Sequence, residues 1–216
     1  MGLKRCKLSE KTQRKLLEFF VLEVTARAAA DLLGLQANTT TLFYRKLRVI
    51  IAEKLEHEAS ELAGEIELDE SYFGGVRKGK RGRGAAGKVP VFGLLKRGGK
   101  VYTQIIDNTR TDTLMPIIRR KIEPDSIVYT DSYRSYNALD ISEFKHYRIN
   151  HSTVFADGRN HINGIENFWN QAKRILRKYN GIPAKQFYWF LKESEFRFNY
   201  GSHRHQCSIL KKWCDL

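Results

Sequence analysis

The chain has 216 residues, of which 42% are hydrophobic and 12% aromatic, so it can bury a core, and composition does not favour an intrinsically disordered chain. Its net charge of +14 and its pI near 9.7 favour a polyanion as partner, because each neutralised phosphate releases condensed counterions; a basic protein without a nucleic-acid role is the alternative. The three cysteines form no CxxC pair, which leaves a disulfide framework and a zinc ribbon without support.

The sequence shows neither a membrane span nor a secretion signal. No apolar run reaches the roughly 18 residues that cross a bilayer. Residues 1–6 lack the apolar segment of a signal peptide. We therefore expect a cytoplasmic protein with no membrane partner.

Residues 1–60 predict a small all-helical module. Apolar residues recur at helical spacing between residues 15 and 24, and Thr25 and Gly34 are suited to begin and end a short alanine-rich helix. Another helix is expected from Asn38 through Ile51. This order is typical of a helix-turn-helix, with a plain helical hairpin as the alternative. In a helix-turn-helix the second helix would present to a DNA groove the side chains of Thr39, Thr40, Tyr44, Arg45 and Arg48.

Residues 61–216 predict a larger α/β domain. Its helices are expected at 111–121, 162–179 and 184–200. Arg97-Gly98-Gly99 is suited to the turn of a β-hairpin. Its strands are expected at 65–69, 89–95, 100–106, 126–130 and 146–150. A central mixed sheet with helices packed on it follows from this order.

A glycine-rich basic loop interrupts this domain between residues 74 and 84. Its glycines keep the backbone mobile while Lys and Arg side chains extend outward. In a protein that holds DNA, the loop is expected to follow the phosphates through Lys78, Lys80, Arg81 and Arg83. A solvated charged loop is the alternative.

Three acids stand out by their positions. Asp69 and Asp131 each end a predicted strand, where a side chain can enter a cleft, and Glu166 lies in the first turns of the helix at 162–179. That helix has one narrow polar stripe, composed of Asn163, Glu166, Asn170, Lys173 and Arg177. Its other side is apolar and can pack on the sheet, which aims Glu166 along the sheet edge and places Lys173 and Arg177 where a DNA backbone would run.

Carboxylates in this arrangement suit metal-dependent phosphodiester chemistry. Two Mg²⁺ ions roughly 3.5–4 Å apart activate a water or 3′-hydroxyl and stabilise the leaving oxygen. Such hard cations take carboxylate oxygens as ligands. We therefore predict that Asp69, Asp131 and Glu166 are catalytic and bind two Mg²⁺ ions, with Mn²⁺ as a substitute. Taken singly, each acid has a structural alternative as a cap, a turn residue or a surface pair.

Five blocks of sequence between Gly64 and Tyr200 are specific in combination. They are Asp69-Glu70-Ser71-Tyr72-Phe73-Gly74-Gly75, residues 91–95, residues 128–133, residues 161–169 and Arg197-Phe198-Asn199. Together they resemble the bacterial insertion-sequence transposases of the DDE type. The resemblance implies a ribonuclease-H-like fold, Mg²⁺ dependence, and cleavage or strand transfer at terminal inverted repeats. It makes Asp69, Asp131 and Glu166 the three acids and Lys173 a residue that holds DNA.

The resemblance also implies the partners. These are the double-stranded DNA of the element ends and of the target, with no small-molecule substrate, and at least a homodimer, because strand transfer holds two ends together. Some members have asparagine in the catalytic signature. Here Glu166 is the stronger metal ligand, and Asn163 is expected either to support the metal ligands or to contact DNA. Many relatives carry a zinc ribbon that this chain, with only Cys6 in that region, does not show.

Two other functions share part of this pattern. A non-catalytic helix-turn-helix protein with a decayed nuclease-like domain would keep the charge and the helical module, but it would have no need of all three acids. A nuclease that cuts without joining strands would share the acids. The helix-turn-helix favours a transposase, since that chemistry requires recognition of specific DNA ends.

Overall fold

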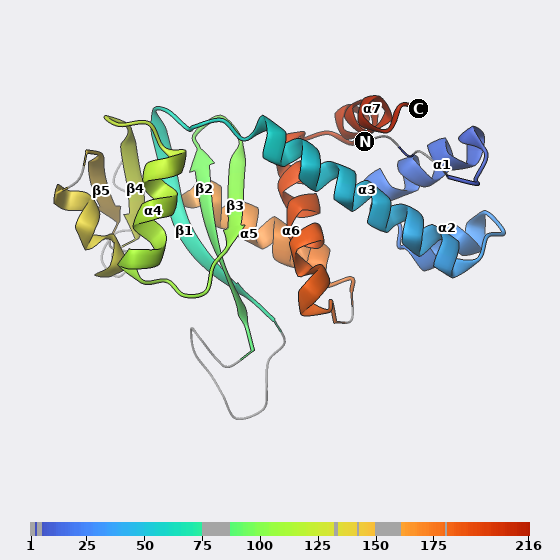
Figure 1. Ribbon diagram of the computed structural model, residues 1–216, viewed down its shortest axis with the longest axis horizontal. Coiled ribbons are helices and arrows are strands. Elements are labelled where there is room, and N and C mark those ends of the chain that lie inside the picture. Colours follow the sequence, from blue (N-terminus) through green and yellow to red (C-terminus); the bar gives the residue numbers. More distant parts are fainter. Residues whose placement is uncertain are drawn as a thin grey trace. The chain divides into compact units, whose positions relative to one another are not determined.

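The computed structural model describes residues 3, 6–74, 87–131, 134–141, 143–149, 161–179 and 181–216 (Figure 1). These residues form two compact units, one within residues 1–58 and 174–216 and the other within residues 59–173. The sequence suggested a single domain boundary near residue 60. In the structure, the chain enters the first unit again at Arg174. None of the described helices is both long enough and apolar enough to cross a membrane.

The first unit is entirely helical. It contains α1 (Glu10–Val21), α2 (Ala26–Leu32), α3 (Ala37–Glu58), α6 (Ala184–Asn199) and α7 (His203–Cys214). Thr25 caps α2 by accepting a hydrogen bond from the N–H of Ala28, and Gly34 has a φ of +61°, so both expectations for this turn are confirmed. Helix α7 was not expected from the sequence. Ser202 caps it by accepting from the N–H of His205.

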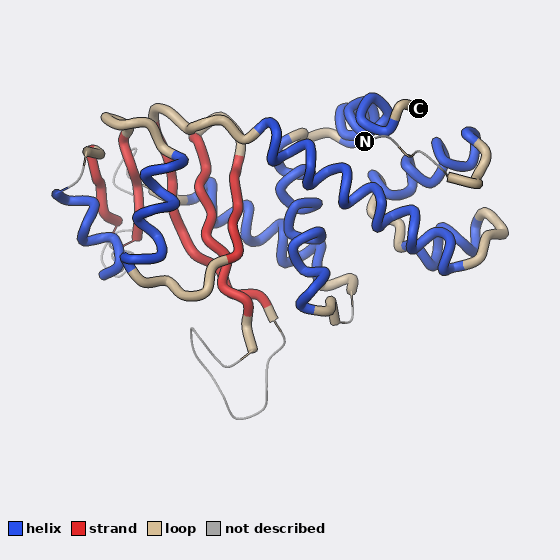
Figure 2. Tube along the Cα trace, in the orientation of Figure 1, coloured by secondary structure: helices blue, strands red, loops and turns tan. Residues whose placement is uncertain are grey.

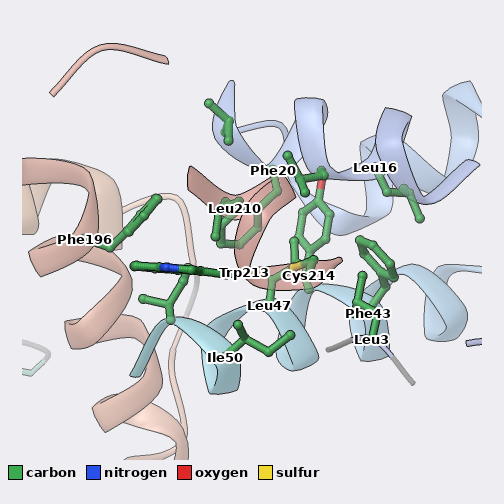
Figure 3. Close-up of a cluster of buried hydrophobic side chains, with 14 of the residues drawn as sticks. Leu3, Leu16, Phe20, Phe43, Leu47, Ile50, Phe196, Leu210, Trp213 and Cys214 are labelled. Carbon is green, nitrogen blue, oxygen red and sulfur yellow. The ribbon is translucent and has the colours of Figure 1, made fainter. Parts of the chain in front are cut away.

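The core of this unit combines the two ends of the chain. Leu16, Phe20 and Leu47 come from α1 and α3, and Leu210 and Trp213 come from α7 (Figure 3). The ring centroid of Phe196 on α6 lies 5.5 Å from that of Trp213, with the two rings tilted by 54°. The N-terminal helices therefore share one hydrophobic core with the C-terminal helices.

The second unit is built on a five-stranded sheet (Figure 2). The strands are β1 (Glu65–Phe73), β2 (Val89–Lys96), β3 (Val101–Ile105), β4 (Ile127–Asp131) and β5 (Lys145–Ile149). Their order in the sheet is β3-β2-β1-β4-β5. The β1–β2 and β2–β3 pairs are antiparallel, and the β1–β4 and β4–β5 pairs are parallel. Gly98 turns the expected β2–β3 hairpin with a φ of +67°.

Helices cover both faces of this sheet (Figure 1). On one face, Ile66 and Leu68 share a core with α4 (Thr111–Lys121) and with Tyr136 of the 3-10 helix at Arg134–Ile141. On the other face, side chains of α5 (Asn163–Leu176) approach β2 at Gly93. A mixed sheet of this order between helices is the ribonuclease-H-like fold, which confirms the fold expected from the sequence.

Candidate active site

The two strand acids lie side by side on neighbouring strands. The register of β1 and β4 pairs Glu67 with Tyr129, and continuing it by two residues brings Asp69 level with Asp131. Side chains two residues apart share a face of a sheet, so both carboxylates lie on the face that α5 covers. Asp131 ends β4 as expected, but β1 continues past Asp69 to Phe73, so Asp69 lies within a strand rather than at its end.

A glycine opposite Asp69 lets α5 approach the sheet. Gly93 on β2 is the pairing partner of Asp69. A Cβ atom at Gly93 would lie 2.5 Å from Cζ2 of Trp169 and 2.9 Å from Cδ1 of Ile165, closer than any side chain allows. Glycine is therefore required at this position for the apolar face of α5 to pack beside the first acid.

The polar stripe of α5 faces solvent as predicted. Asn163, Glu166, Asn170 and Lys173 are all exposed, as is Arg177, which the expected helix included but which lies in the turn just after α5. Ile165, Phe168, Trp169 and Ala172, on the opposite side, are buried. The amphipathic pattern thus presents Glu166 at the start of the helix while the helix is fixed to the sheet.

The pKa of Asp69 is shifted by burial and by the charges of neighbouring acids. Burial and the negative charges of Glu70, Asp131 and Glu166 together raise the pKa of Asp69 to about 8, against a hydrogen bond from the backbone of Glu70 that lowers it. Carboxylates that share a site disfavour each other's charged form. The charges of both predicted partners, Asp131 on β4 and Glu166 on α5, therefore act on the Asp69 carboxyl.

The donor atoms of this cluster suit a hard divalent cation. All are carboxylate oxygens, and the mutual repulsion that raises the pKa of Asp69 is what a bound cation would offset. Within the described ranges, no group of three or more His, Cys, Asp or Glu side chains is already gathered to hold a metal ion.

Sequence reasoning missed two acids beside the predicted ones. Among the neighbouring charges, that of Glu70 raises the pKa of Asp69 the most. Its Oε1 accepts a hydrogen bond of 2.6 Å from the hydroxyl of the buried Tyr136. Glu67 is 1% exposed and contacts Arg97 and the first turn of α5. Glu67 lies on the same face of β1 as Asp69, because residues two apart in a strand share a face, and the fold shows what covers it.

Of the five predicted DNA contacts that the structure describes, four are exposed: Arg45, Asn163, Lys173 and Arg177. Lys173 has its Nζ 5.9 Å from the ring centroid of Phe73, on the same unit as the acids. Arg45 is exposed on α3. The basic-loop residues Lys78, Lys80, Arg81 and Arg83 lie outside the described residues.

Arg48 does not present its side chain to solvent, contrary to the expectation for the second helix. It is 6% exposed, and its Nε lies 2.6 Å from Oε2 of Glu193. Thr40 and Tyr44 are buried on the same side of α3. These residues of α3 therefore face the core of the helical unit. The solvent face of α3 is formed by Thr39, Thr41, Leu42, Arg45 and Lys46.

The sequence matches known transposases over much of its length. Residues 61–199 match the family described as the ISXO2-like transposase domain. An "uncharacterized transposase-like protein" of Haemophilus influenzae is 60% identical over 113 residues, which cover 52% of this chain and 92% of that protein.

Two solved structures show weak likeness. A Mos1 transposase paired-end complex with the left transposon end has a TM-score of 0.30 at 12% identity, covering 93% of this chain and 80% of that one. The Mos1 strand transfer complex has a TM-score of 0.31 at 13% identity, covering 100% and 81%. Likeness at this level does not bear on function. The match over residues 61–199, together with the Haemophilus relative, shows that the chain belongs to the insertion-sequence transposases with an ISXO2-like transposase domain.

Proposed function

We propose that this protein cleaves DNA at the terminal inverted repeats of an insertion sequence and joins the released ends to target DNA, with Asp69, Asp131 and Glu166 as its catalytic acids. The observation that supports the proposal is the register of β1 and β4, which pairs Glu67 with Tyr129 and, extended by two residues, would bring Asp69 level with Asp131. The charges of Asp131 and Glu166 at Asp69 support the same grouping. Membership of the transposase family supports the substrate.

The acids would hold two Mg²⁺ ions, with Mn²⁺ as a substitute. When bound, such ions activate the attacking hydroxyl and stabilise the leaving oxygen. The protein contributes two rigid strands that fix Asp69 and Asp131 and a helix that brings Glu166 to them. Asn163 and Lys173, on the polar stripe of α5, and Arg177, just after the helix, would hold the DNA backbone in position for the reaction.

Recognition of the element ends would fall to the helical unit and to the basic loop. Arg45 is exposed on α3 and is available to a phosphate or a base edge. The basic residues Lys78, Lys80, Arg81 and Arg83 add positive charge close in sequence to the catalytic strand β1. Two ends must be held together for strand transfer, so the working form on DNA would be at least a homodimer, acting in the bacterial cytoplasm.

The test is a cleavage assay on a labelled duplex that carries the element's own end, with Mg²⁺ or with EDTA. The purified protein is compared with Asp131→Asn and with Asp125→Asn. Asp125 is an exposed residue at the opposite end of β4, with a φ of +64° that asparagine also adopts, so it is a matched control. We expect metal-dependent nicking at the element boundary by the parent and the control, and none by Asp131→Asn. Tight binding to the end without cutting in Mg²⁺ or Mn²⁺ would instead favour a non-catalytic DNA-binding protein.

A further inference from the structure

Glu67 is a buried acid that the proposed chemistry does not use. Its side chain is 2% exposed, although an isolated carboxylate is costly to bury. It lies on β1 two residues before Asp69 and on the same face of the sheet. Both of its oxygen atoms have partners within the sheet unit, and one of those partners is the helix that carries Glu166.

The first partner is the backbone of α5. Oε2 of Glu67 accepts a hydrogen bond of 2.9 Å from the N–H of Ile165. The first N–H groups of a helix have no partner within it, and a side chain at the residue before the helix commonly accepts from one of them. Here that residue is Ile162, whose carbonyl accepts from the N–H of Glu166 and whose side chain has no acceptor. Glu67 therefore caps α5 from the neighbouring strand, at the peptide next to Glu166.

The second partner is Arg97, at the end of the β2–β3 hairpin. Its Nε donates to Oε1 of Glu67 at 2.9 Å, and its Nη2 donates to the carbonyl of His161, just before α5. The guanidinium also lies 3.6 Å from the ring centroid of Tyr129 on β4. Arg97 thus neutralises Glu67 and joins β1, β4 and the segment that leads into α5.

A glycine makes this contact sterically possible. A Cβ atom at Gly164 would lie 2.8 Å from Oε2 of Glu67 and 2.6 Å from Cδ2 of Leu95. Alanine within a helix is ordinarily more stable than glycine by about 0.5–1 kcal/mol. The glycine at this position therefore serves the approach of the carboxylate to the helix rather than the stability of the helix itself.

We infer that Glu67 is a positioning residue, which with Arg97 fixes the first turn of α5 against β1 and so sets the place of Glu166 relative to Asp69. This inference rests on the proposed function, because it assigns Glu67 its role through the third catalytic acid. Small displacements of catalytic groups cost large factors in rate, on the order of 100-fold for about 1 Å. Glu67 itself touches neither the metal nor the DNA in this account.

The experiment compares the parent with Glu67→Gln, and with Glu61→Gln as a control at an exposed acid just outside β1. Two quantities are measured: the cleavage rate at increasing Mg²⁺, and the Mg²⁺ concentration that gives half of the rise in melting temperature without DNA. We expect Glu67→Gln to remain folded and to bind DNA as the parent does. Its cleavage rate falls about 10–100-fold and its half-saturating Mg²⁺ concentration rises about tenfold or more, as for residues that orient metal ligands. Glu61→Gln behaves as the parent.

A second pair of variants covers the case in which Glu67→Gln fails to fold. Gly164→Ala is expected to lower cleavage despite the better helix former, and Glu67→Asp in the same chain is expected to restore part of the loss by withdrawing the carboxylate. Such non-additivity is the sign of a direct contact. Additive losses in the double variant, or parental cleavage and Mg²⁺ response in Glu67→Gln, overturn the inference. A parent protein that fails to cleave while Asp131→Asn binds DNA equally well overturns the proposed function, and the inference with it.

Discussion

The Nε atom of Arg48 on α3 lies 2.6 Å from Oε2 of Glu193 on α6, and both side chains are almost fully buried. Arg197 donates to the other oxygen of the same carboxylate at 2.7 Å, and to the carbonyls of Phe20 and Val21. The guanidinium of Arg48 lies 3.9 Å from the ring centroid of Phe190. One buried carboxylate thus joins α3 to α6, and Arg197 connects both to the end of α1.

Arg48→Ala is expected to lower the free energy of unfolding by about 3–5 kcal/mol, because it removes one partner of a buried ion pair. Urea denaturation measures the loss. Arg45→Ala is the matched control, since Arg45 is exposed one turn away and should cost no more than about 0.5 kcal/mol. Equal urea midpoints for the two variants would contradict the role of Arg48 in the core.

The pH dependence of this ion pair has a definite sign. Burial alone would raise the pKa of Glu193, but the charges and hydrogen bonds of Arg197 and Arg48 outweigh it and hold the pKa below its ordinary value of 4.5. A lowered folded-state pKa contributes stability that is complete above pH 4.5 and is lost as the pH falls through the folded value. The penalty of Glu193→Gln should therefore be constant between pH 6 and pH 7 and shrink below pH 4.5. Urea denaturation at each pH tests this, and a penalty that grows on acidification would exclude it.

Arg48 also shows where the sequence stops being informative. Helical spacing correctly predicted α3 and its apolar residues, but the buried side of a helix can include a charge when a distant residue pairs with it. Glu193 lies 145 positions from Arg48, and no local pattern connects them. The same holds for Glu67, whose partner Ile165 lies 98 positions away.

Other features could be predicted because their causes are local. The β2–β3 hairpin follows from the glycines near residue 98, and the polar stripe of α5 follows from the helical repeat. Asp131 was expected at the end of a strand because a short buried-type run precedes it. Helix α7 was not predicted, although Ser202 before it is a good N-cap.

Asp69→Asn is expected to stabilise the metal-free protein while abolishing cleavage. Burial and three neighbouring acids raise the pKa of Asp69 to about 8, so ionising this carboxyl costs folding free energy that a neutral amide does not. In EDTA at pH 8 the melting temperature should rise by about 2–4 °C for each kcal/mol that is relieved. Asp125→Asn, at an exposed site, serves as the control. A lower melting temperature for Asp69→Asn in EDTA would show that the acids do not repel one another.

Gly93→Ala is expected to displace α5 from the sheet. The added methyl group would meet the rings and methyls of Trp169 and Ile165, and overpacking of this kind costs about 1–3 kcal/mol. Thermal denaturation and the cleavage assay should both show the loss. Gly99→Ala is the comparison, because its new Cβ would meet only the flexible side chain of Lys96. Similar losses of stability and cleavage in Gly93→Ala and Gly99→Ala would contradict the requirement for glycine where α5 approaches Gly93.

Arg45→Ala is expected to weaken binding to the element end without unfolding the helical unit. Removing one phosphate contact should reduce the slope of log K against log salt by about 1. Filter binding or fluorescence anisotropy between 50 and 200 mM salt, typical conditions for such slopes, measures it. Arg14→Ala, on the exposed side of α1, is the control. An unchanged slope would place end recognition on other residues.

The helical unit draws its core from residues 1–58 and from residues 174–216, while the sheet unit is one continuous segment. On a ribosome the two units therefore mature in a fixed order. We expect the sheet unit to fold once α5 has emerged, whereas the core of α1 and α3 is completed only by Leu210 and Trp213. A nascent chain thus has its chemical centre before it has a finished helical unit. Premature termination within the last forty or so codons would release a sheet unit without a stable helical partner, a product that cellular proteases would readily remove.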